Sequence, residues 1–425
     1  MKCAGWALKS RVLHAFLLLI WVFVLTPDCF SYSVLTHEEV VDLLWKDEII
    51  PNLRSRFPNL TEQQLLEAHA YAYGGSVIQD LGYYPFGTKE FSSLTHYVRS
   101  GDFVRELIRQ SRDANEFAFA MGALAHYASD VSGHPAINQA VAILYPKLQA
   151  KYGNSVTFAQ DKSAHVKTEF GFDVAQVARA RYVVDQYHAF VGFEVSRALL
   201  ERVFPIVYGR ELTDVIPEVD LSIGSYRYAV SQFIPMLTES AAKSRKNEIP
   251  PSSSTPQQQI FQYRLSRAEY EKEWGANYSK PGPFLRFVGG LVRIVSKIGP
   301  FHTVLFRVPT PQTEEIYVRS INKTVDLYKG YLRSVRAGSL TISNMDLDSG
   351  KPTTASEYTL ADRTYEELLL KLAEHDFAAA TPELQKNILS YFANYSPNLH
   401  SRKDRARWSK LQESLAMLRN SGTSP

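Results

Sequence analysis

An all-α fold is predicted by three observations on the sequence. Pairs with capping-box spacing, in which Thr or Asp is followed three residues later by Glu or Gln, precede helical apolar patterns at Thr36, Thr61 and Asp113. Alternating apolar and polar residues, which are typical of strands, are scarce. The 425 residues are 45% hydrophobic and 21% charged, so most of the chain can build a core and is not disordered.

Residues 1–31 are predicted to be an export signal. Basic residues precede an apolar run over residues 12–25, which has signal-peptide length and is short for a membrane span. Small residues at Cys29 and Ser31 place the expected cleavage before Tyr32. The only other cysteine, Cys3, is also removed, which excludes disulfides and thiolate metal sites in the mature chain. We therefore expect a secreted or periplasmic protein; the alternative is an uncleaved membrane anchor.

The mature chain is predicted to have two parts joined by a linker. A helical domain covers residues 32–246, a polar linker rich in Pro, Ser and Gln covers 247–259, and a helical C-terminal region covers 260–425. Within the domain, residues 74–87 are expected to form a glycine-punctuated loop. Within the C-terminal region, residues 265–274 and 363–391 are expected to be helical, and 337–356 to be a long polar loop.

The nearly balanced charge indicates no class of partner, so the function has to be inferred from local groups of residues. Lys and Arg number 47 and Asp and Glu 44, so a net charge of +3 offers no argument for general nucleic-acid binding. Histidines, in contrast, are concentrated: seven of the eleven lie between residues 37 and 188. His69 and His188 are expected to be core residues or neighbours of ligands. The concentration of the others predicts a metal site with nitrogen and oxygen ligands.

The sharpest motif is His126, Asp130 and His134, spaced four residues apart. This spacing projects all three side chains from one side of a helix. The flanking residues are apolar or small all round, so the helix is expected to be buried, and a buried carboxylate requires a cation. No Lys or Arg occurs between Arg112 and Lys147. A metal ion is therefore expected beside Asp130; the alternative is an arginine from another helix.

Weaker candidates complete the set. His165 and Glu169 again have four-residue spacing and suit two ligands of one Zn²⁺, although such a pair is more often a solvated surface pair. Asp80 lies in the glycine-rich segment, where aspartates commonly form turns. A single histidine such as His96 is commonly an ordinary core residue.

These histidines and carboxylates, together with His37, follow one another in an order that resembles the metal ligands of the zinc-dependent phospholipase C superfamily. This superfamily includes the single-strand-specific zinc nucleases. The resemblance covers about residues 32–200 and implies an all-α domain with three zinc ions. It implies that one zinc is bound by Asp80, His96, His126 and Asp130. A second would be bound by His134, His165 and Glu169, and a third by Tyr32 through its free amine, His37 and Asp130. Asp80 is also the expected catalytic residue, which orients or deprotonates the attacking water.

The sequence departs from the best-known members at two points. His134 follows Asp130 by only four residues, a shorter gap than in the bacillus-type phospholipase C and the nucleases. The short form resembles relatives of glycosylphosphatidylinositol-specific phospholipase D and bacterial members. Leu81 and Ser93 stand where the bacillus-type enzyme has choline-pocket aromatics, which argues against phosphatidylcholine specificity.

The expected function is a secreted, monomeric phospholipase C that cleaves glycerophospholipids into diacylglycerol and a phosphorylated head group, with no nucleic-acid partner. A basic, apolar segment at 283–307 is expected to contact an anionic membrane surface, or else to pack on the catalytic domain. One alternative is a single-strand zinc nuclease with base-stacking tyrosines at positions 71, 73, 83 and 84. Another is a non-catalytic zinc- and membrane-binding protein.

Overall fold

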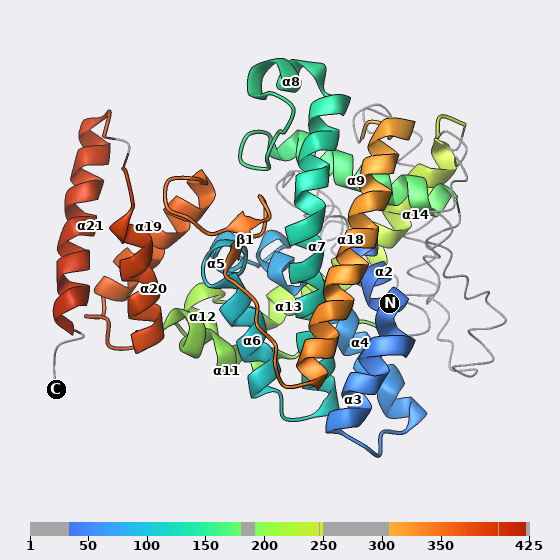
Figure 1. The fold of residues 1–425 in the computed structure, drawn as a ribbon, viewed down its shortest axis with the longest axis horizontal. Coiled ribbons are helices and arrows are strands. Elements are labelled where there is room, and N and C mark those ends of the chain that lie inside the picture. The colour runs from blue at the N-terminus through green and yellow to red at the C-terminus, as the bar shows by residue number, and fades with distance from the viewer. Residues whose placement is uncertain (1–33, 180–191, 246, 250–305, 398, 422–425) are drawn as a thin grey trace, which may run out of the picture.

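The computed structural model describes residues 34–179, 192–245, 247–249, 306–397 and 399–421 (Figure 1). Helices dominate these residues. Their strands are β1 (Met345–Asp346) and β2 (Lys351–Pro352), which form one antiparallel hairpin with Met345 opposite Pro352. The prediction of an all-α fold is therefore confirmed.

The central element is α7 (Ala114–Leu144), which is buried along most of its length. The side chain of Asp113 caps its first turn by accepting a hydrogen bond from the amide of Glu116, at 2.9 Å. Small residues let neighbours approach closely: a Cβ on Gly122 would lie 2.1 Å from the carbonyl oxygen of Ala72 in α4 (Glu62–Ser76). Because α7 is apolar or small on every side, other helices can surround it.

The helix α18 (Pro311–Arg336) packs along α7 and against α2 (Val34–Leu44) and α3 (Ile50–Arg56), although it follows the predicted linker (Figure 1). Tyr317, Tyr328 and Leu332 of α18 belong to the same hydrophobic core as α7, and the hydroxyl of Tyr328 donates to the carbonyl of Met121. The C-terminal region is thus not packed separately from the domain. Of the predicted linker, the structure describes only residues 247–249.

The other elements surround this core, and α19 to α21 lie at the opposite end of the molecule from α2 to α4 (Figure 1). On the N-terminal side of the chain they are η1 (Trp45–Ile49), η2 (Ile78–Tyr83), α5 (Lys89–Tyr97), α6 (Ser100–Gln110), α8 (Pro146–Tyr152) and α9 (Lys162–Ala178). They continue with α11 (Arg197–Tyr208), α12 (Leu212–Val215), α13 (Val219–Tyr228), η4 (Ala229–Phe233), α14 (Ile234–Ser244), α19 (Thr359–Ala373), α20 (Pro382–Ala393) and α21 (Arg402–Ser421).

Local predictions had mixed outcomes. The capping box at Thr61 forms with Gln64, as expected. Thr36 is not a cap, because it lies inside α2 and its hydroxyl instead donates to Asp173, at 2.7 Å. Residues 74–87 are not simply a loop, since α4 runs to Ser76 and a 3-10 helix, η2, follows. The expected helix over 363–391 is interrupted between α19 and α20, where two consecutive residues have positive φ.

Several expectations concern residues outside the described part of the chain. These are the export signal at 1–31, the helix at 265–274 and most of the basic apolar segment at 283–307. Within the described residues, none of the helices is both long enough and apolar enough to cross a bilayer.

Candidate metal centre

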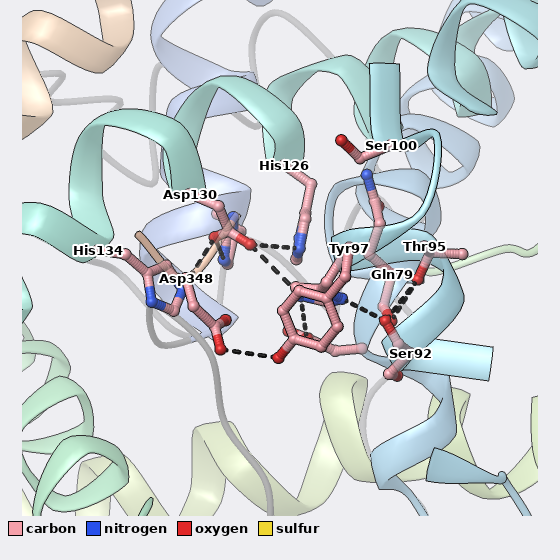
Figure 2. Close-up of polar contacts among 12 residues, drawn as sticks. Gln79, Ser92, Thr95, Tyr97, Ser100, His126, Asp130, His134 and Asp348 are labelled. Atoms are coloured by element: carbon pink, nitrogen blue, oxygen red, sulfur yellow. Dashed lines mark hydrogen bonds and ion pairs between the residues drawn. The ribbon is translucent and has the colours of Figure 1, made fainter. Parts of the chain in front are cut away.

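The helix α7 presents His126, Asp130 and His134 on one side, as their spacing predicted (Figure 2). All three are buried. Nε2 of His126 lies 3.0 Å from Oδ2 of Asp130, and Nε2 of His134 lies 3.5 Å from Oδ1. One carboxylate thus stands between two imidazoles of the same helix.

Two other helices bring further histidines to Asp130. Nε2 of His37, from α2, lies 3.6 Å from Oδ1 of Asp130, and Nε2 of His96, from α5, lies 3.5 Å from Oδ2. Burial acts to raise the pKa of Asp130, but His126 and His134 hold that pKa well below its usual range. The carboxylate is therefore ionised and needs positive charge beside it, which a metal ion or protonated imidazoles can supply.

The described residues contain three groups whose ligand atoms lie within 4.8 Å of one another. Each group consists of three fully buried side chains. The groups are Asp80, His96 and His126; His134, His165 and Glu169; and His37, His126 and Asp130. The structure therefore brings together all the predicted ligands that it describes; Tyr32 lies outside the described residues.

The ring orientations of His96 and His126 test whether this centre fits zinc. Nδ1 of His96 bonds to the carbonyl of Ser92, at 2.8 Å, and Nδ1 of His126 bonds to that of Ser76, at 3.0 Å. A carbonyl only accepts, so Nδ1 carries a proton, and in the neutral ring Nε2 presents a lone pair to the group. Within the described residues, both Nε2 atoms are buried without a hydrogen bond. Metal-bound histidines characteristically have this arrangement.

The second group gives the same result. Asn138 donates from Nδ2 to the carbonyl of Asp348, so its Oδ1 accepts from Nε2 of His165, at 2.9 Å. Nδ1 of His165 then presents a lone pair to Oε1 of Glu169, at 2.9 Å. Two acceptors at this distance need a proton or a cation beside them. Among the described residues, neither carboxylate oxygen of Glu169 has a hydrogen bond, which fits a zinc site with N and O ligands.

Burial also decides the protonation of this pair. Burial, followed by the neighbouring His134, lowers the pKa of His165 to about 3, so the ring is neutral and can act as a ligand. Burial raises the pKa of Glu169 well above its usual range, which a bound cation would oppose. Because neither side chain is accessible, the interpretation of His165 and Glu169 as a solvated surface pair is wrong.

Asp80 lies in η2 beside the first group. It is 2% exposed, and its Oδ1 lies 3.3 Å from Nε2 of His96. The adjacent residue Gln79 is held on both sides, since its Nε2 donates to the carbonyl of Ala123 and its own carbonyl accepts from the Thr95 hydroxyl (Figure 2). Asp80 is therefore directed into the centre by a fixed backbone and is not an exposed turn residue.

One residue at the centre was missed by sequence reasoning. Asp348 lies in the loop after α18, is 2% exposed, and accepts the hydroxyls of Tyr97 and Tyr358 on Oδ2, at 2.7 and 2.6 Å. The sequence contains only a weak indication of this residue, because the pair Asp346 and Asp348 has a spacing that also occurs in ordinary turns.

His69 lies outside the three groups. Its Nε2 bonds to Oδ1 of Asp42, and its ring stacks on Trp45 with centroids 3.8 Å apart. It is therefore a packed core residue, one of the two roles expected. His188 lies outside the described residues.

The fold and the site define a helical protein with a buried centre of histidines and carboxylates suited to several metal ions. Residues 36–215 match the family described as zinc dependent phospholipase C. This match, which covers fewer than half of the 425 residues, supports the zinc-dependent phospholipase C family for the helical domain and, with the buried ligand groups, a zinc-dependent phosphodiester hydrolase. Among curated proteins and solved structures, nothing matches the chain.

Proposed function

We propose that the protein is an exported, monomeric phospholipase C that cleaves glycerophospholipids into diacylglycerol and a phosphorylated head group. The observation that carries the proposal is the set of three buried groups of ligand atoms that meet around Asp130. The family supports zinc as the metal, and the three groups support three ions.

Bound zinc would polarise the phosphoryl oxygens, lower the pKa of a water and stabilise the leaving oxygen. The chain provides neutral histidines as ligands, each oriented by a carbonyl or amide oxygen behind it. Asp130 would be shared between two ions, since His37 and His96 approach its two different oxygens. Asp80 would orient the attacking water or accept its proton.

The proposed third ion would use the amine of Tyr32, exposed when the export signal is cleaved. The beginning of α2 is tightly fixed near this point. The Leu35 amide and the Thr36 hydroxyl both donate to the carboxylate of Asp173, at 3.0 and 2.7 Å. This anchor supports the proposal because it holds the segment immediately before His37 close to the centre.

The surroundings favour a lipid over a single-stranded nucleic acid. Tyr73 and Tyr84 are buried in the core, so they cannot stack on bases. Tyr83 is only partly buried, with its ring centroid 6.1 Å from that of His96, and can line the site. Phe86, in the turn that follows η2, is 55% exposed, and an exposed apolar ring suits a lipid surface.

Membrane contact through residues 283–307 stays part of the proposal. Only the end of this segment is described. Phe306 packs edge-on against Phe170, with centroids 5.7 Å apart, and the guanidinium of Arg307 lies over the ring of Tyr145. Phe306 therefore packs on α9, and Arg307 on the residue that follows α7, as the packing alternative expects.

Parallel assays of one purified sample test the function. Release of diacylglycerol from vesicles with different head groups is compared with release of nucleotides from single-stranded DNA, before and after removal of zinc by a chelator. We expect zinc-dependent release of diacylglycerol and none of nucleotides. Nucleotide release alone would identify a nuclease, and zinc binding without either activity would identify a non-catalytic binding protein.

A further inference from the structure

The loop that contains Asp348 lies against the metal centre, although it is far outside the family-matched residues. Tyr127 of α7 donates to the carbonyl of Ser343, and the Leu347 amide donates to the carbonyl of His96, at 2.8 and 3.2 Å. Gly350, at φ +67°, lies so close to the backbone of α7 that a Cβ on it would be 2.4 Å from the carbonyl oxygen of Val131. The loop therefore packs directly on α5 and α7, two of the helices that carry predicted ligands.

The side chain of Asp348 is fixed in this loop. Its Oδ2 accepts the hydroxyls of Tyr97, next to His96, and of Tyr358. Figure 2 shows Asp348 beside His134, with its carboxylate directed towards Tyr97. Two hydroxyl donors stabilise a buried carboxylate and hold it in one orientation.

The backbone of Asp348 is linked to His165. Its carbonyl accepts from Nδ2 of Asn138, at 3.2 Å, and this bond determines that Oδ1 of Asn138 faces His165. If the amide were reversed, an NH₂ group would face Nε2, and the ring would have to carry its proton on Nδ1, the atom that faces Glu169. The loop thus sets the tautomer in which His165 can bind a metal.

The charge of Asp348 also complements this group. His134, His165 and Glu169 together provide one negative charge, while Zn²⁺ carries two positive charges. Asp348 lies beside His134, on the same side of the centre as this group (Figure 2). A second carboxylate at this side would balance the ion without being one of its ligands.

We propose that Asp348 is a positioning residue of the metal centre: its carboxylate balances the charge of the ion held by His134, His165 and Glu169, and its backbone orients His165 through Asn138. The inference rests on the proposed zinc centre and not on the identity of the substrate. It assigns a role at the site to the C-terminal region, which residues 36–215 do not contain.

The test is a stepwise zinc competition with a chelator on the full mature chain. Asp348→Asn keeps the shape and an oxygen that can accept from the tyrosines, but removes the charge. The zinc ion held by His134, His165 and Glu169 is identified as the one that Glu169→Gln fails to bind. We expect Asp348→Asn to bind this ion about 10- to 100-fold more weakly and to bind the other ions with unchanged affinity. Asp348→Glu should recover part of the loss, because it restores the charge.

The matched control is Asp362→Asn. Asp362 also accepts two hydrogen bonds on one oxygen, from the amide of Ser356 and the hydroxyl of Tyr391, and both donors lie in the C-terminal region. This variant should bind zinc as the wild type does. Thermal unfolding of the zinc-free proteins shows whether each variant is folded.

If Asp348→Asn does not fold, Asn138→Ala takes its place and should weaken binding of the same ion. Unchanged affinity for this ion in either folded variant overturns the inference. A wild type that binds no zinc would instead overturn the proposed function. Wild-type zinc binding and hydrolysis are therefore measured first, so that the two failures are distinguished.

Discussion

The replacement of Asp130 by Asn is the most direct test of the centre. Asp130 is completely buried, and nitrogens of four histidines lie between 3.0 and 3.6 Å from its oxygens. The amide keeps the shape but removes the charge that two proposed zinc ions share. Loss of one partner of a buried charge pair costs about 3–5 kcal/mol, which corresponds to an affinity weaker by about 150- to 5,000-fold.

The assay measures bound zinc by elemental analysis after dialysis, together with turnover. We expect Asp130→Asn to lose at least one zinc ion and nearly all activity. Asp113→Asn is the matched control, because it removes a carboxylate from the cap of the same helix and asparagine is an equally good N-cap. Full zinc occupancy and near-normal turnover in Asp130→Asn would refute the shared-ligand assignment.

Three further predictions concern the N-terminus, pH and the membrane. An extra methionine before Tyr32 should leave the fold intact but weaken one zinc and reduce activity, because a free neutral amine is needed; proteolytic exposure of Tyr32 should restore both, and an extended protein with full zinc and turnover contradicts the assignment. Burial lowers the pKa of His134, but Asp130, Asp348 and Glu169 together raise it, to about 9, so zinc must displace a proton at pH 7. Zinc affinity should therefore rise with pH up to about 9, with proton release detectable by calorimetry in buffers of different ionisation enthalpy, and an affinity independent of pH would contradict this reasoning. Charge reversal at Arg293 and Lys297 should weaken binding to anionic vesicles in a flotation assay by at least about 1 kcal/mol per residue, with little effect on a soluble substrate; equal losses on both would indicate packing.

Local relationships within a helix were predictable from the sequence. The four-residue spacings in α7 and α9 correctly placed His126 with Asp130 and His165 with Glu169, because the helical period determines which side chains share a face. The absence of charge around Asp130 in α7 likewise indicated a buried helix. The series of ligand types could be assembled into one site only through the family resemblance, since spacing does not determine how separate helices meet.

The tertiary structure decided which distant segments meet. It stacks His37 of α2 on His126 of α7, with ring centroids 4.3 Å apart, and it packs α18 along α7 across the predicted linker. It also brings Asp348, from a segment expected to be a polar loop, to Tyr97 and Asn138. Such contacts depend on how whole helices bury their apolar faces together and on which buried polar groups must find partners. Neither depends on a local period, so no pattern within a short window of the sequence could reveal them.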